Sequence, residues 1–262
     1  MTLRKLMFAL AFSIAATAVN AAPLSSHVDF SNGGQGWEGM QPANGVGGSW
    51  IDTDAGKDAP ALRTVLENFG ISFSTKTNQN FLGDYSRLGS VTIGLDIIAN
   101  SIRYIDQDVT RNLVVELRDY GNTPAGMPYT SVWFDLGTID PALGWQHLSV
   151  TIADTAMAAL PPGWGGYGST NDREGPGLPP GRTFADVLSS VDELVFTTFV
   201  PGMAYGFTNF DVAVDNISLS AGVAEVPEPS SYALLAGGLG LMGLMTRRRP
   251  RQERPTRAFA AH

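Results

Sequence analysis

The sequence contains no cysteine, and only three of its residues are histidine. Without cysteine there can be no disulfide bond, no thiol nucleophile and no zinc site built on thiolates. Two of the histidines, His27 and His147, lie in the central part of the chain, so histidine-based catalysis has few candidates. Stability must therefore come from the burial of apolar side chains, or from a bound metal ion.

Positive charge is also scarce in the central part of the chain. Residues 23–222 hold nine Lys and Arg against twenty-two Asp and Glu, a net charge of −13, whereas the whole chain carries −8. A surface this acidic repels phosphate backbones, so we expect no nucleic-acid partner. No serine lies in a Gly-x-Ser-x-Gly turn, and no carboxylate pair stands in a recognisable catalytic motif. We therefore predict that the protein is not an enzyme.

The first residues have the three-part layout of a secretory signal peptide. Arg4 and Lys5 precede an uncharged run from Leu6 to Val19, and the small residues Ala21 and Ala22 follow. The run is shorter than the ~20 apolar residues that a membrane span needs. We predict a signal peptide over residues 1–21 that is cleaved after Ala21, with cleavage after Ala22 as the alternative.

A second uncharged apolar segment stands near the other end of the chain. It predicts a transmembrane helix over residues 230–246, and the basic residues after it would hold its C-terminal end on the cytoplasmic side. Everything between the two end segments would then lie outside that membrane. The predicted domains are the signal peptide, an ectodomain over residues 22–222, and a linker with the anchoring segment and a basic tail over residues 223–262.

The motif before the apolar segment and the basic cluster after it carry a family resemblance. The residues are Val226, Pro227, Glu228 and Pro229, and then Arg247, Arg248 and Arg249. This order resembles the PEP-CTERM sorting signal. The resemblance implies processing by an exosortase, a membrane protease-transpeptidase, in Gram-negative bacteria that make exopolysaccharide. It implies a protein anchored in the inner membrane before sorting and then found at the cell surface or in the extracellular matrix. The tail from Pro250 to His262 is longer and more basic than that pattern, so a role of the arginines as a topology signal alone stays open. The alternative to the sorting signal is an ordinary C-terminal anchor in which Pro-Glu-Pro occurs by chance.

The ectodomain shows hydrophobic residues at every second position, which is the pattern of half-buried strands. The segments are short and are separated by Gly, Pro, Asn and Asp, which favours an antiparallel sandwich over βαβ units. The alternating residues are Phe69, Ile71 and Phe73; Val91, Ile93, Leu95 and Ile97; Leu113, Val115 and Leu117; Val132, Phe134 and Leu136; Leu148, Val150 and Ile152; Leu194, Phe196 and Thr198; and Val212, Val214, Ile217 and Leu219.

One or two short helices interrupt this pattern. Thr183 and Asp186 have the spacing of a capping box and predict a helix that begins near Phe184. Residues 153–160 are a second, weaker helical candidate, which Pro161 and Pro162 would end. Residues 161–181 are rich in Gly and Pro and predict a long ordered loop.

A second resemblance covers roughly residues 50–220. Its residues are Phe81-Leu82-Gly83-Asp84, Gly144-Trp145, Trp164, the apolar positions 184–194, Gly202, and Val214-Asp215-Asn216-Ile217-Ser218-Leu219. They resemble the laminin B module, also called laminin domain IV, although laminin versions contain cysteine. Such modules are similar to jelly-roll carbohydrate-binding modules, so the resemblance implies an all-β, antiparallel jelly-roll sandwich of binding or architectural character.

The jelly-roll resemblance also implies a structural calcium site. In such modules the first and last strands lie side by side and hold Ca²⁺ between two acidic residues, which here would be Asp29 and Asp215. Carboxylate and backbone oxygens are the ligands that Ca²⁺ prefers. The alternative is that both residues are ordinary carboxylates at strand ends.

The tryptophans are the candidates for ligand binding, because a flat aromatic ring can carry a sugar ring. Trp37, Trp50 and Trp164 lie in Gly-rich segments where a ring can stay exposed, whereas Trp145 is expected in the core. The sequence thus predicts an exported, non-enzymatic surface or matrix protein that binds exopolysaccharide or a neighbouring matrix protein. The alternative of a different class is a polysaccharide lyase or hydrolase on a jelly-roll scaffold.

Overall fold

The computed structural model describes residues 25–42, 46–58, 60–170 and 177–222, and all of them lie in the first of two compact units that divide after Ala224. Within the described residues no helix is long and apolar enough to cross a membrane. The predicted signal peptide, the sorting motif and the predicted transmembrane helix over residues 230–246 all lie outside the described residues.

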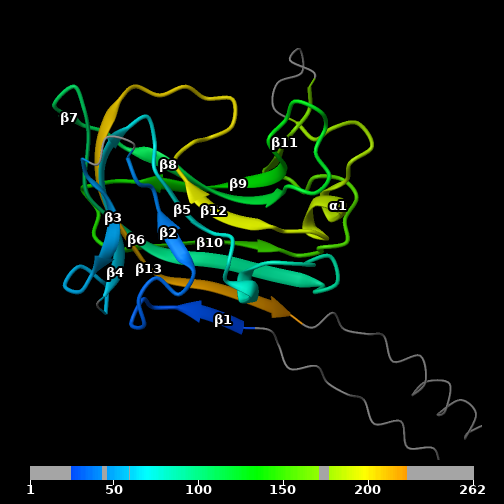
Figure 1. Ribbon diagram of the computed structural model, residues 1–262, viewed down its shortest axis with the longest axis horizontal. Coiled ribbons are helices and arrows are strands. Elements are labelled where there is room, and N and C mark those ends of the chain that lie inside the picture. The colour runs from blue at the N-terminus through cyan, green and yellow to red at the C-terminus, as the bar shows by residue number, and fades with distance from the viewer. Residues whose placement is uncertain (1–24, 43–45, 59, 171–176, 223–262) are drawn as a thin grey trace, which may run out of the picture. The chain divides into compact units, whose positions relative to one another are not determined.

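Two antiparallel sheets contain almost all of the regular secondary structure in the described residues (Figure 1). The first, which we call sheet A, has the strand order β10-β6-β13-β4-β3, with β1 also paired to β13 and β7 to β6. Its strands are β1 (Ser25–Val28), β3 (Gly48–Asp52), β4 (Ala61–Asn68), β6 (Ser90–Tyr104), β7 (Gln107–Asp108), β10 (Gln146–Ile152) and β13 (Thr208–Gly222).

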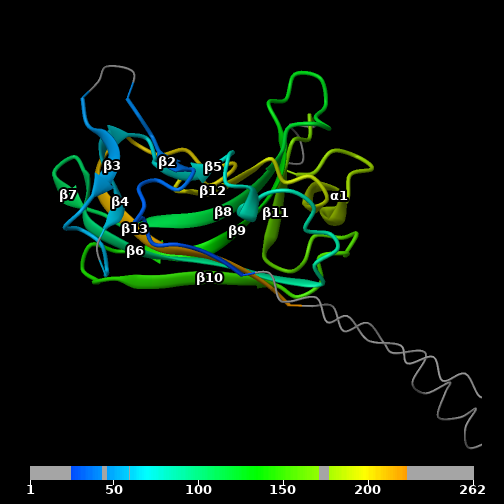
Figure 2. The same cartoon turned by 60° about the horizontal axis from the view of Figure 1, so that its bottom comes forward.

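The second sheet, sheet B, has the order β11-β9-β8-β12-β5-β2. Its strands are β2 (Trp37–Gly39), β5 (Ser72–Thr75), β8 (Arg111–Asp119), β9 (Thr130–Ile139), β11 (Trp164–Tyr167) and β12 (Glu193–Thr197). Figure 2 shows the two sheets as separate layers, with β6 and β10 below β8 and β12. The prediction of an all-β antiparallel jelly-roll sandwich is confirmed.

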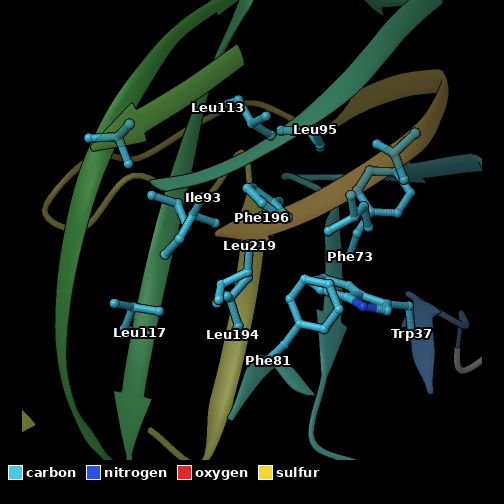
Figure 3. Close-up of a cluster of buried hydrophobic side chains, with 14 of the residues drawn as sticks. Trp37, Phe73, Phe81, Ile93, Leu95, Leu113, Leu117, Leu194, Phe196 and Leu219 are labelled. Carbon is cyan, nitrogen blue, oxygen red and sulfur yellow. The ribbon is translucent and has the colours of Figure 1, made fainter. Parts of the chain in front are cut away.

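The core fills the space between the two sheets (Figure 3). Each strand sends alternate side chains inward, so Ile93 and Leu95 of β6 meet Leu117 of β8 and Phe196 of β12 in one buried cluster. Trp37 closes one end, stacked on Phe196 with ring centroids 5.8 Å apart. Because successive side chains of a strand point to opposite faces, the residues that point outward from each sheet follow from the same alternation.

The last strand, β13, is as long as its partner β6, at 15 residues each, and contains an irregularity. Its pairing with β6 shifts register between Asp215 and Ser218, and Asn216 has a φ of 49°, a left-handed conformation that asparagine tolerates better than most residues. The shift explains why the apolar alternation jumps from Val214 to Ile217. As expected, the first strand β1 lies beside the last one, with Val28 opposite Ile217.

The predicted capping box is present at α1 (Phe184–Leu188). The Thr183 hydroxyl accepts a hydrogen bond from the Asp186 backbone N–H at 3.1 Å, and the Asp186 carboxylate accepts one from the Thr183 N–H at 2.9 Å. The second predicted helix, over residues 153–160, is wrong, because that segment forms turns. The carbonyls of Met157 and Ala158 accept hydrogen bonds from the first N–H groups of α1. These carbonyls are therefore paired with α1 and not with a helix over residues 153–160.

Two further expectations need correction. Phe69 does not share the buried face of Ile71 and Phe73, because it precedes β5 and is 52% exposed. The segment 161–181 is not wholly a loop, because Trp164–Tyr167 adds the edge strand β11 to sheet B. A short 3-10 turn, η1 (Gln79–Phe81), lies between β5 and β6.

Candidate functional site

The outward face of sheet B carries a buried network of charged groups centred on Arg118. Its Nε and Nη2 atoms donate to Glu116 Oε2 at 2.8 and 2.5 Å, and its Nη1 donates to Glu193 Oε2 at 3.0 Å. Ser131 Oγ donates to the other oxygen of Glu116 at 2.5 Å. Glu116 and Glu193 are only 2% and 4% exposed, so the arginine compensates two desolvated carboxylates.

Electrostatics and burial act against each other at Arg118. Burial alone would lower the pKa of its guanidinium, but the attraction of Glu116 and the hydrogen bond to it outweigh burial and raise the pKa. Lys76 lies 3.8 Å from Glu193 Oε1 and behaves likewise, with a raised pKa despite partial desolvation. Two cations and two carboxylates thus hold one another in place on this face.

Three tyrosines surround this network. Tyr129 lies over the guanidinium of Arg118, with 4.3 Å between the Cζ atom and the ring centroid. Its ring also contacts those of Tyr120 and Tyr167, at centroid distances of 5.7 and 5.1 Å. Tyr120 donates its hydroxyl hydrogen to Glu193 Oε2 at 2.5 Å. Burial raises the pKa of Tyr129, and the nearby Glu116 raises it further, so both of these phenols stay protonated hydrogen-bond donors at neutral pH.

A tryptophan extends the aromatic surface across the edge of sheet B. Trp133 points outward from β9, and its register partner on β11 is Gly165. A Cβ atom built on Gly165 would lie 2.2 Å from Cε2 of the indole, so the ring lies directly on the glycine backbone. The indole Nε1 donates to the carbonyl of Gly166 at 3.4 Å. The absence of a side chain at position 165 is therefore what lets the indole lie flat.

We call Arg118, Tyr120, Tyr129, Trp133 and Tyr167 the sheet-B surface. It combines partly exposed aromatic rings with polar groups whose positions are fixed by buried partners. Ring faces can stack on an apolar partner, while the phenol hydroxyls and the guanidinium can bond to hydroxyl groups. Such a surface can bind a polar molecule that also has flat apolar faces.

Two of the three predicted ligand-binding tryptophans do not lie on any exposed surface. Trp37 is 3% exposed and packs edge-on against Phe81 as well as on Phe196. Trp164 is 8% exposed and contacts Phe184 of α1 with ring centroids 5.2 Å apart. Both belong to the core, because each Gly-rich segment contributes a strand whose inward position the ring takes. The expectation that these rings stay exposed is wrong.

The third predicted residue, Trp50, is 43% exposed on the outward face of β3. It lies beside Arg63 of β4, whose Cζ atom is 5.8 Å from the indole centroid. Sequence reasoning also placed Trp145 in the core, but it is only half-buried and lines a surface hollow with Arg63.

The two predicted calcium ligands lie on or next to neighbouring strands, because β1 pairs with β13, but their carboxylates accept hydrogen bonds from different groups. Asp29 follows β1, and its Oδ1 accepts from the N–H and the hydroxyl of Ser31. Asp215 is 2% exposed and accepts from the N–H groups of Lys57 and Asn216 at 3.0 and 2.7 Å. Burial raises the pKa of Asp215. Within the described part of the chain, no three acidic or histidine side chains cluster as a metal site would require, and the calcium site stays a prediction.

Sequence reasoning counted Trp133 among the aromatic residues but did not single it out as a candidate for ligand binding, although a signal was present. The inward positions Val132 and Phe134 of the predicted strand place Trp133 on the outward face. The pair Gly165-Gly166 offers a backbone that an aromatic ring can cover. What the sequence could not supply is the pairing of β11 with β9, which brings these residues together.

Comparison with protein families identifies the class of the chain's C-terminal end. Residues 225–249 match the model of the PEP-CTERM protein-sorting motif, which contains Val226, Pro227, Glu228, Pro229 and the three arginines. The chain is therefore an exported protein with a C-terminal membrane-anchoring sorting signal, and the resemblance noted from the sequence is confirmed. Comparison with curated proteins gives no match.

Among solved structures, the chain is similar to a family 30 carbohydrate-binding module of a cellulosomal cellulase of Clostridium thermocellum, at 14% identity, a TM-score of 0.41, and coverage of 77% of this chain and 98% of that one. An exo-β-agarase gives 12% identity, a TM-score of 0.42, and 77% and 26% coverage. A Clostridium thermocellum xylanase that includes a carbohydrate-binding module, solved with xylohexaose, gives 10% identity, a TM-score of 0.40, and 76% and 28% coverage.

Proposed function

We propose that this exported protein is a non-enzymatic surface or matrix protein that binds polysaccharide through the sheet-B surface. The observation that carries the proposal is the indole of Trp133, laid flat over Gly165 beside a set of tyrosines held by charged partners. A sugar ring has an apolar face and a rim of hydroxyl groups. Flat aromatic rings with fixed hydrogen-bonding groups next to them are complementary to both.

The charge balance of this surface favours an uncharged polymer. Arg118 and Lys76 are offset by Glu116 and Glu193, so no net charge is left to select an ionic ligand. Because the four groups are held in place before binding, a ligand would not have to order them, which reduces the entropy cost of association. The alternative partner, a neighbouring matrix protein, would need a larger contact surface.

The same network supports the non-enzymatic part of the proposal. Hydrolysis of a glycosidic bond needs two carboxyl groups that can reach the scissile oxygen and the anomeric carbon. Glu116 and Glu193 are the paired carboxylates of this face, but they lie beneath Arg118 and Tyr120 and are nearly inaccessible. Freeing either one would break its bonds to a buried cation, at a cost of about 3–5 kcal/mol.

The sorting signal supports an exosortase as the processing partner and the inner membrane as the site of anchoring before sorting. Mass spectrometry of the protein recovered outside the cell tests this part. We expect loss of residues 1–21 and cleavage near Pro227. An extracellular protein that runs intact from Met1 to His262 would contradict it.

Binding itself is tested on a glycan array that includes the exopolysaccharide of the producing bacterium. We expect an uncharged polysaccharide to bind, and Trp133→Ala to weaken binding by at least about 30-fold, since a central aromatic contact is typically worth 2 kcal/mol or more. The matched control is Phe69→Ala, which removes an exposed aromatic ring from a loop outside this surface. A reducing-sugar assay runs in parallel. Release of sugar would overturn the non-enzymatic proposal, and equal binding by both variants would remove the sheet-B surface from it.

A further inference from the structure

The outward face of sheet A carries a second arrangement of aromatic and polar groups. The register of the sheet places Trp50 opposite Arg63, Arg63 opposite Ala213, and Ala213 opposite Ile98. Trp145 continues this row, because the next residue, Gln146, pairs with Ile97. Two indoles thus stand at the two ends of one row that crosses five strands, about 19 Å apart at the usual strand spacing.

Arg63, the second position of this row, is held in place by three hydrogen bonds. Its Nε and Nη2 atoms donate to the two oxygens of Asp211 at 2.8 and 2.7 Å, and its Nη1 donates to Asp52 Oδ2 at 2.9 Å. Asn100 also donates to Asp211, at 3.1 Å. The hydrogen bonds that Arg63 donates to Asp211 and Asp52 raise its pKa despite partial burial, so the group is a permanent cation. These polar groups therefore have one orientation before any ligand arrives.

Next to the row the surface is hollowed. One hollow of about 550 Å³ is lined by Arg63, Ile98, Asn100, Trp145 and the loop around Asp54. A second, of about 650 Å³, is lined by Asn100 together with Asp108–Thr110 and Asp140–Ala142. Because Asn100 lines both, the two hollows adjoin, and we call them together the sheet-A groove.

The side chains that line the groove limit the class of ligand that it can bind. Trp145, Ile98, Val109 and Pro141 supply apolar contact, and most of the polar side chains in the lining supply hydrogen-bond acceptors. The lining holds four aspartates, Asp52, Asp54, Asp108 and Asp140, against the single cation Arg63. A polymer of uronic acids or phosphates would be repelled here. Two of these aspartates already pair with arginines, Asp52 with Arg63 and Asp108 with Arg103, so hydroxyl groups suit the groove better than ammonium groups.

We infer that the sheet-A groove is a second carbohydrate-binding site, which takes an uncharged polysaccharide along the row from Trp145 toward Trp50. The two outward faces of a two-layer sandwich point in opposite directions. A single chain with a site on each face can therefore join two polysaccharide chains. This bridging role rests on the proposed function of the sheet-B surface. The assignment of the sheet-A groove as a binding site does not depend on that function.

The test is calorimetric titration of the full chain, kept in a zwitterionic detergent without a sugar head group. The probes are xylohexaose, cellohexaose, the exopolysaccharide of the producing bacterium, oligogalacturonate as an anionic comparator, and a lysine-rich peptide. We expect an uncharged probe to bind with a stoichiometry of two per chain. Trp145→Ala should reduce the stoichiometry to one, and so should Trp133→Ala on the opposite face.

Two further variants guard against loss of folding. Trp145→Tyr keeps a flat ring and should restore most of the binding that Trp145→Ala removes. Asn100→Ala, at an exposed position shared by both hollows, should weaken this site by roughly tenfold, the value of one hydrogen bond to a fixed group. The melting temperature of each variant shows whether the sandwich is intact.

The outcomes separate the two sites. If Trp145→Ala and Asn100→Ala fold normally and bind every probe as the parent chain does, the sheet-A site does not exist. Binding that depends on Trp145 for the peptide or the oligogalacturonate, but for no uncharged glycan, would also overturn the inference. A stoichiometry of one that is lost in Trp145→Ala and kept in Trp133→Ala would support the groove and contradict the proposed sheet-B surface.

Discussion

The contact between Trp133 and Gly165 offers a sharp test of the sheet-B surface. In Gly165→Ala the new methyl group would lie 2.2, 2.3 and 2.6 Å from the Cε2, Cζ2 and Nε1 atoms of the indole. Since carbon atoms in contact stay about 3.5–4.0 Å apart, the ring must move by more than about 1 Å. Overpacking of this kind costs about 1–3 kcal/mol, or a fall in melting temperature of roughly 2–12 °C for a domain of this size.

The same change should weaken glycan binding, because a lifted indole no longer holds the position on the backbone of Gly165 that presents its ring to a ligand. We expect a loss of affinity of about tenfold or more, or roughly 1.4 kcal/mol, measured by calorimetric titration. The matched control is Gly177→Ala, where an added methyl group meets no atom within 4 Å. If Gly165→Ala has the same melting temperature and the same glycan affinity as Gly177→Ala, the reasoning about Trp133 is refuted.

Three other predictions concern the charged groups. Arg118→Met leaves Glu116 buried without its cation and should lower the free energy of unfolding, measured in urea, by about 3–5 kcal/mol; no change would contradict a compensated network. Burial raises the pKa of Asp211, but the hydrogen bond from Arg63 outweighs it and the net pKa is lowered. The stabilisation from ionised Asp211 is therefore complete above a pH of about 4 and is lost as the pH falls below that value. In a plot of the urea unfolding midpoint against pH, Asp211→Asn should show a smaller decrease at acid pH than the parent chain. Finally, if Ca²⁺ binds at Asp29 and Asp215, chelator should lower the melting temperature of the parent chain but not that of Asp215→Ala.

Much of the sandwich follows from local alternation. The inward residues of β6, β8, β10 and β12 could be named from the sequence, because a half-buried strand repeats every two residues wherever its partners lie. The capping box at Thr183 is equally local, since both of its hydrogen bonds join residues three positions apart. These features need no knowledge of the tertiary structure.

The binding residues depend instead on which strands are neighbours. Trp164 lies in a Gly-rich segment, yet its side chain points into the core, because β11 pairs with β9 and sets Trp164 opposite Phe134. Trp133 becomes a candidate only when β11 brings Gly165 beneath its ring, and Trp145 only when β10 sets it beside Ile98. Pairings between segments so far apart in the chain leave no periodic trace in the sequence. The Gly-rich surroundings of Trp37 and Trp164 therefore predicted exposure for two rings that are buried, and only Trp50 of the three is exposed.

The indole N–H signals of the five tryptophans, recorded by NMR during titration with an uncharged glycan, test the central claim most directly. Trp37 and Trp164 are buried in the core and serve as internal controls. We expect the signal of Trp133 to shift with bound glycan, and those of Trp145 and Trp50 to shift if the sheet-A groove is also occupied, while both core signals stay in place. A titration that saturates binding without moving the signal of Trp133 would contradict the claim that the sheet-B surface binds polysaccharide.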